Sequence, residues 1–332
     1  AARAGDPVKA RAIYDAAVKK LEAALEAAEA GKAAPVVLDE IHGELAERKL
    51  LVGPRNEDSK KFQEDVEKHL ARLRVSAAPQ LRLKGKFLDA AMAERQGKLE
   101  KARTLLGPLA TDTKEPGVAF LGNVLLAGLS EALRDPAGAL AALNEVEAGY
   151  QKLAGGSTTA REWADRYLPG GPEMIKARQA TANLNLALQQ VAKYRKDNPG
   201  KPLPPDLLTP REAPAAAKFA ELKPPTPAFL NAALAFANYY LLTGRRPEAE
   251  KLLDKLATDY PRSAAVLRAR CNLLAFPADG GGTASPNGVV AADVLARKYM
   301  KDFPGDRVGP LFMAEWLIRT NRAATLFPST TL

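Results

Sequence analysis

Cysteine, histidine and aromatic residues are scarce in this chain of 332 residues. Cys271 is the only cysteine, so the chain can form neither an internal disulfide nor a cysteine-based zinc site. Only two histidines occur, and aromatic residues make up 6% of the sequence, which is few for a protein that stacks nucleic-acid bases. No uninterrupted apolar run reaches about 18 residues, so we expect no direct membrane insertion.

The charge is basic but not clustered. Lys and Arg total 48 against 39 Asp and Glu, a net charge of +9. The stretch from Thr226 onward holds 13 basic and 9 acidic residues, and the remainder holds 35 and 30, so the excess is spread along the chain. Nucleic-acid binding is typical of a concentrated basic face, and we therefore expect no nucleic-acid partner. With 46% apolar and 26% charged residues, the chain is typical of a folded protein with a core.

The chain begins Ala1-Ala2-Arg3 without methionine. Such a start is what a signal peptidase leaves, and it is also what an artificial end looks like. We expect an exported protein, periplasmic or extracellular, in preference to a cytoplasmic one.

Apolar residues recur at three- and four-residue spacing nearly everywhere, and alternating strand patterns are almost absent. The sequence therefore predicts an all-α protein. The first helix opens at Asp6-Pro7, where Asp6 suits a cap and Pro7 the first turn. Further helices are expected at 35–51, 57–76, 79–96, 98–110, 117–134, 136–153, 157–168, 172–197, 210–221, 227–243, 246–260, 262–276, 288–303 and 306–320.

Prolines interrupt this pattern between Asn198 and Pro227. Nine of them fall there, at positions 199, 202, 204, 205, 210, 214, 224, 225 and 227. No continuous helix tolerates such spacing, so we expect an extended segment with one short helix near 213–222. The predicted domains are an N-terminal helical-hairpin array over 1–198, a Pro-rich linker or strap over 199–226, and a C-terminal array over 227–332. The stretch 277–287, with three consecutive glycines at 280–282, is expected to be a surface loop.

The two predicted arrays share a sequence repeat. Residues 244–259 align without a gap with residues 97–112, and eight of the sixteen positions are identical. The shared Gly244 and Gly97 suit the turn between two helices, because glycine adopts a left-handed conformation easily. The shared Ala249 and Ala102 allow two helices to approach closely, and the shared leucines fill the seam between them.

A period near 34 residues, with this pattern of glycine, alanine and an exit proline, resembles the tetratricopeptide repeat (TPR) family. The best match is 230–262, with Ala237, Tyr240, Gly244, Ala249 and Pro261 at the family's positions. Weaker copies are 83–116, 117–151 and 263–304, so that TPR-like repeats lie around 83–151 and beyond 227. The resemblance implies a right-handed α-solenoid of antiparallel helical hairpins, with the first helix of each hairpin lining a concave groove that holds an extended peptide or a partner's helix.

Projecting the family's inward-facing positions onto this chain gives the candidate groove residues Asn231, Asn238, Leu241, Leu242, Arg268 and Asn272. Asn238 lies where carboxylate-clamping members place an asparagine that grips a peptide backbone, and Arg268 suits a carboxylate. Leu234 stands where that clamp has a lysine. The alternative is that these are ordinary solvated or inter-repeat residues.

No pattern points to catalysis. The histidines, His42 and His69, lie in different expected helices, and we expect both at the surface or at helix ends rather than in a metal site. Acidic pairs such as Glu44 and Glu47 lie on helices rich in Lys and Arg, where ion pairing explains them better than acid–base chemistry. We therefore expect no enzyme, no cofactor and no metal.

The sequence favours a non-catalytic scaffold that binds a protein or peptide partner in the groove. The alternative is a structural subunit that assembles with copies of itself, as a homo-oligomer or filament packed through the solenoid's ends and flanks. The stretch Leu326-Phe327-Pro328 lacks the polar character of a capping repeat and motivates this alternative. A helical toroid associated with an enzyme is a third interpretation.

Overall fold

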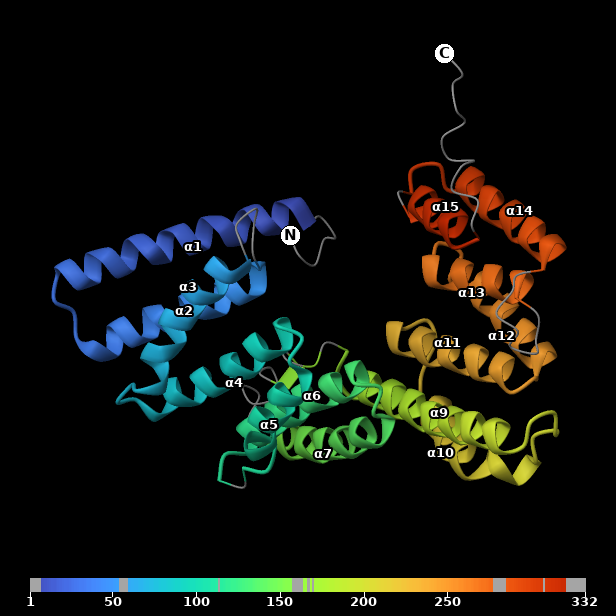
Figure 1. Cartoon of the computed structure of the whole chain (residues 1–332), viewed down its shortest axis with the longest axis horizontal. Coiled ribbons are helices and arrows are strands. Elements are labelled where there is room, and N and C mark those ends of the chain that lie inside the picture. Colours follow the sequence, from blue (N-terminus) through green and yellow to red (C-terminus); the bar gives the residue numbers. More distant parts are fainter. Residues whose placement is uncertain are drawn as a thin grey trace, which may run out of the picture. The chain divides into compact units, whose positions relative to one another are not determined.

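The computed structural model describes residues 7–53, 59–112, 114–156, 164–165, 168, 170–276, 285–306 and 308–320. Within these residues all regular structure is helical, with fourteen α-helices, one short 3-10 helix and no strand (Figure 1). The all-α prediction is confirmed. Most of the helix expected at 157–168 lies outside the described residues, as do residues 277–284 of the expected glycine-rich loop.

The chain divides into two compact units, Ala1–Asp135 and Pro136–Leu332. The helices of the first unit follow one another, each packed against the next, and α2 also touches α4. Several of them begin at a proline, whose missing N–H costs no bond in a first turn. Their bounds are α1 Pro7–Ala30, α2 Pro35–Val52, α3 Ser59–Arg74, α4 Pro79–Arg95, α5 Leu99–Ala110 and α6 Pro116–Ala132.

The second unit is built around a helix of 27 residues, α9, which packs against α7, α10 and α11. Beyond α11 the helices form two successive pairs, α11 with α12 and α13 with α14, and α15 packs against both α13 and α14. The bounds are α7 Pro136–Ala154, α9 Gly171–Asp197, α10 Thr209–Ala220, α11 Pro227–Leu242, α12 Arg246–Asp259, α13 Ala264–Ala275, α14 Pro286–Asp302 and α15 Val308–Arg319, and the 3-10 helix η2 spans Pro205–Leu207.

The Pro-rich segment 199–226 lies inside the second unit rather than between two units. The division of the chain falls at Asp135–Pro136, which differs from the expected boundary. The reason is α10, which packs on α9 and is tied to the next hairpin. Glu212 of α10 accepts hydrogen bonds from both terminal nitrogens of Arg245, at 2.9 and 3.0 Å, and from the Tyr239 hydroxyl at 3.1 Å.

In each of the helix pairs α11–α12 and α13–α14, a tyrosine hydroxyl connects the end of the second helix to the start of the first. The Tyr260 hydroxyl, just after α12, donates to the Thr226 carbonyl at the start of α11 at 3.1 Å. The Tyr299 hydroxyl near the end of α14 donates to the Arg262 carbonyl before α13 at 2.9 Å. The end of each second helix therefore lies beside the start of its first helix, so both pairs are antiparallel hairpins.

The two stretches that repeat in sequence share one local structure. Gly244 and Gly97 have left-handed φ values of +84° and +71° in the turns before α12 and α5. Ala249 and Ala102 then lie on the first turns of these helices with 0% and 1% of their surface exposed. At this position only a small side chain such as that of alanine fits, because the neighbouring helix packs directly against it.

We therefore predict that Ala249→Leu destabilises the second unit by about 1–3 kcal/mol, since a larger side chain overpacks a buried seam. Thermal and urea unfolding followed by circular dichroism measure the effect. Lys251→Leu, two residues away and exposed, is the matched control and leaves the midpoint within about 0.5 kcal/mol of the parent. Equal midpoints for the two variants contradict the close contact at Ala249.

Candidate functional site

The first helix of the best-matching repeat, α11, presents a partly polar exposed stripe. Asn231 and Asn238 are exposed and two turns apart, and Leu242 follows one turn later with 40% of its surface exposed. These spacings place all three side chains on one face of the helix. Leu241 differs, because it is half-buried and packs against the hydrophobic core that contains Ala249 and Leu253.

The candidate residues of α13 are engaged with α15. Arg268 is half-exposed and forms an ion pair with Glu315 at 2.6 Å. Asn272, one turn further on, accepts a hydrogen bond from Arg319 at 3.0 Å. The second contact lies one helical turn beyond the first on both α13 and α15, so the two helices lie side by side along this turn. Arg268 thus has a carboxylate partner within the chain.

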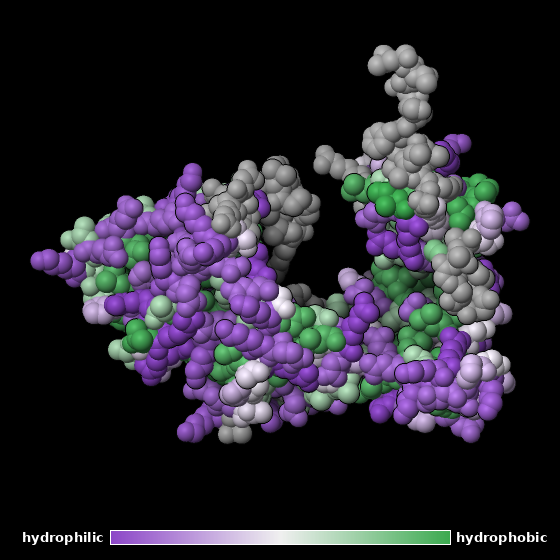
Figure 2. Space-filling model, viewed as in Figure 1, coloured by the Kyte–Doolittle hydropathy of each residue, from purple (hydrophilic) through white to green (hydrophobic). Residues whose placement is uncertain are grey.

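The same face of α15 continues with exposed apolar residues. Leu311 and Ile318 flank Glu315 by one turn on either side and expose 65% and 63% of their surface. The opposite face is buried through Phe312 and Trp316, whose indole N–H donates to Asp293 of α14 at 2.9 Å. Figure 2 shows hydrophobic surface over α15 and α14. Helix α15 is thus packed against α13 and α14 on one side and carries an exposed apolar pair on the other.

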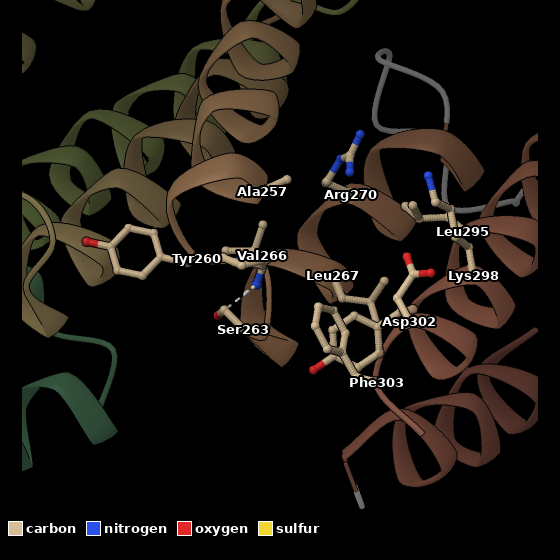
Figure 3. A pocket seen from close by; sticks show the side chains of 12 residues that line it. Ala257, Tyr260, Ser263, Val266, Leu267, Arg270, Leu295, Lys298, Asp302 and Phe303 are labelled. Atoms are coloured by element: carbon tan, nitrogen blue, oxygen red, sulfur yellow. Dashed lines mark hydrogen bonds between the residues drawn. The ribbon is translucent and has the colours of Figure 1, made fainter. Parts of the chain in front are cut away.

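A separate pocket of about 230 Å³ opens between the ends of α12 and α14, beside the start of α13. Figure 3 shows its apolar wall, in which Leu267 of α13 lies close to Phe303, with Leu295 of α14 further along. Arg270 and Lys298 contribute cations to its lining. The pocket residues of α13 lie on a different side of that helix from Arg268 and Asn272, so the pocket and the polar face are two distinct surfaces.

The ionisable groups of this pocket suit binding rather than proton transfer. Arg270 is paired with Asp254 at 2.9 Å. Burial, together with a hydrogen bond to Asp306, raises the pKa of Tyr299 to about 12. The Tyr299 hydroxyl therefore keeps its proton at neutral pH, and its single hydrogen is shared between two acceptors, Asp306 at 2.6 Å and the Arg262 carbonyl at 2.9 Å. The pocket can accept one apolar side chain beside a charged rim.

Cys271 lies on α13 between these two surfaces but reaches neither as a reactive group. It is fully buried in the core of α13, α14 and α15, and its thiol lies 3.6 Å from the Ala292 carbonyl. Burial raises the pKa of this thiol to about 12. Only the thiolate is nucleophilic, so the residue acts as a small apolar side chain, as its apolar sequence context indicates.

We predict that a thiol-labelling reagent reacts with Cys271 slowly in the native chain at pH 8 and rapidly in 6–8 M urea, about a hundredfold faster or more, because unfolding restores an ordinary thiol pKa. Absorbance-monitored labelling with and without urea measures the ratio. As an internal check, Ala292→Gly loosens the packing over the thiol and raises the native rate. Native labelling as fast as that of the unfolded chain contradicts the burial of Cys271.

One of the two histidines, His69, is not at the surface or at a helix end, where both are expected. His69 of α3 is buried with 7% of its surface exposed, and its ring faces that of His42 on α2. The expectation of two surface residues is thus wrong for His69. The missed signal is the spacing on α3, because Phe62, Val66 and His69 fall on one apolar stripe. A histidine on such a stripe is directed toward the neighbouring helix.

Within the described residues, no group of three or more His, Cys, Asp or Glu side chains could hold a metal ion. Among the helices that the structure describes, none combines the length and the apolarity needed to cross a bilayer. No family model matches the chain, and neither a curated protein nor a solved structure matches it.

Proposed function

We propose that the chain is a non-catalytic scaffold that binds a partner peptide or helix on the face of α11, α13 and α15. This face consists of Asn231, Asn238 and Leu242 of α11, Arg268 and Asn272 of α13, and Glu315 of α15. We further propose that the hairpins continue as a right-handed TPR-like solenoid, in which this face is the concave one. The observation that carries the proposal is the contact of α13 with both α11 and α15, which makes three first helices successive neighbours.

The chemistry of the face suits an extended peptide. Asn231 and Asn238 have no side-chain hydrogen bond within the described part of the chain, and an amide can serve both the C=O and the N–H of a peptide. Arg268 and Glu315 hold opposite charges at a distance where either can exchange its partner for a ligand group. Because such an exposed pair contributes little stability, breaking it for a ligand costs little.

Preorganisation favours binding. Helices α11 and α13 are both capped by side chains, since the Thr226 and Ser263 hydroxyls accept hydrogen bonds from the Phe229 and Val266 amides. With the tyrosine contacts at the base of each hairpin, the helices are ordered before any ligand arrives. A rigid surface loses little conformational entropy on binding.

The test is a displayed peptide library selected on the intact chain, followed by affinity measurement on a selected peptide. We predict that Asn238→Ala with Arg268→Ala weakens binding about tenfold or more, the loss of about 1.5–3 kcal/mol expected for hydrogen bonds to charged groups. Helicity and melting temperature stay nearly unchanged, because both residues are exposed. Lys298→Ala with Asp302→Ala, at the rim of the pocket between α12 and α14, is the matched control and leaves affinity intact. If the pocket variant loses affinity and the variant of Asn238 and Arg268 keeps it, the peptide binds in the pocket and the proposal is contradicted.

One observation favours a second candidate function, a subunit that assembles with copies of itself. Leu311 and Ile318 form an exposed apolar pair one turn on either side of Glu315, and nothing within the described residues covers it. Two such pairs from two copies of the chain would bury one another, since apolar surface gains free energy when it leaves water.

We predict that, if this assembly operates, sedimentation velocity across a hundredfold range of concentration shows an oligomer that Leu311→Lys with Ile318→Lys converts to a monomer. Val290→Lys with Val294→Lys, which alters a comparably exposed pair on α14, serves as the control and leaves the oligomer intact. A parent chain that is monomeric at every concentration contradicts this second function and leaves the peptide-binding face unaffected.

A further inference from the structure

The only two histidines of the chain meet in the first unit, although 27 positions separate them. The Nδ1 atoms of His42 on α2 and His69 on α3 lie 2.8 Å apart, and the ring centroids 5.1 Å apart. At this distance the two nitrogens share one hydrogen, so that one ring donates and the other accepts. The contact therefore requires that at least one Nδ1 carries no proton.

The second nitrogen of His69 lies without a partner among the described residues. Its Nε2 is buried, and no hydrogen-bond partner for it exists within the described residues. A buried polar atom without a partner is costly, and the cost is larger when the ring is charged. Protonation of His69 leaves an N–H on both of its ring nitrogens. The Nε2 hydrogen then lies at this buried position without an acceptor, and the Nδ1 hydrogen is accommodated only while the Nδ1 of His42 carries none, so protonation of both rings breaks the contact.

The charged groups around the pair are already engaged with one another. Lys49 of α2 pairs with Glu22 of α1 at 2.9 Å and with Asp65 of α3 at 2.5 Å. Arg72 of α3 pairs with Asp39 of α2 at 2.7 Å. Glu29 of α1 also acts on His42. From α4, which packs on α2 and α3, Lys84 pairs with Glu44 and Glu47 of α2.

These surroundings oppose a positive charge on either ring. Burial, together with Lys49 and His42, lowers the pKa of His69 to about 4, although Asp65 and Glu22 act in the opposite direction. Burial and Arg72 lower the pKa of His42, against the effect of Glu29 and Asp39. The four carboxylates fail to compensate, because three of them are paired with Lys49 and Arg72, whose own positive charges disfavour a charged ring.

We propose that the His42–His69 pair is an acid-sensitive latch, which holds α2 against α3 at neutral pH and releases this contact of the first unit on mild acidification. An exposed histidine has an ordinary pKa near 6.5. In the open form, in which the contact between His42 and His69 is broken, the histidines become protonated below about pH 6.5. In the closed form, in which the contact is intact, His69 becomes protonated only near pH 4. The closed form has its full stability above pH 6.5 and loses it as the pH falls through this window.

Hydrogen exchange of the intact chain measures the release. Between pH 7.5 and 5.5, after correction for the intrinsic rate of exchange, the opening equilibrium of the α2 and α3 amides should rise about tenfold or more. Carboxylates with an ordinary pKa near 4 stay ionised in this range, so the histidines are the side chains that titrate. The amides of α11 and α13 in the second unit are the internal control and keep their protection.

The matched variant is His42→Leu with His69→Leu, which replaces both partners of the hydrogen bond by apolar groups and should abolish the pH dependence. His69→Gln is the second variant, because its amide keeps a polar group at the contact but does not titrate, and its response should be smaller than that of the parent chain, since only His42 remains to titrate. A parent chain whose α2 and α3 amides open equally at pH 7.5 and 5.5 overturns the latch. Persistence of the pH dependence in both variants overturns it too, since another group would then be responsible.

A direct titration needs no variant. Proton NMR of the native chain resolves two histidine ring signals, and neither should titrate with a midpoint near 6.5 while the first unit is closed. Two ordinary midpoints near 6.5 in the closed chain overturn the proposal. Neither experiment involves the peptide-binding face, so the latch and the proposed function are tested separately.

Discussion

The close approach of neighbouring helices is the constraint on which the rest of this structure depends. Each helix is apolar along one side only and must bury that side against another helix. Small residues allow this close approach. Ala249 and Ala102 are buried, with 0% and 1% of their surface exposed. A Cβ atom on Gly122 of α6 would lie 2.7 Å from the Ala110 nitrogen of α5, which is too close for any larger residue. Leucines and aromatic residues then fill the seams on either side of these contacts.

Polar contacts add orientation to this packing. The tyrosines at 260 and 299 tie the base of each hairpin, and the Glu212–Arg245 pair fastens α10 to the next turn. Arg245 also lies over the rings of Tyr239 and Tyr240, at 5.1 and 4.5 Å from their centroids. Such contacts fix the orientation of the helices in each pair, while Asn231, Asn238 and Leu242 of α11 stay exposed.

The helices could be predicted from the sequence and the partners of their side chains could not. Expected and observed bounds agree within a few residues for most helices, because the three- and four-residue spacing is a local property. The surroundings of the candidate residues show the same limit. Asn231, Asn238 and Leu242 are exposed, whereas Leu241 packs inward and both Arg268 and Asn272 bind residues of α15. Those partners lie 47 positions away, beyond what a local pattern can indicate.

The amino-acid sequence by itself determined that this protein is helical, where most of its helices lie to within a few residues, and that a turn glycine and an alanine five residues later recur in both halves. These features depend on backbone conformation and on periodicity within single helices. Only the tertiary structure decided that the Pro-rich segment belongs to the second unit and that His42 meets His69. Both outcomes depend on which faces of distant helices bury each other, and that choice is made by the packing of the whole unit.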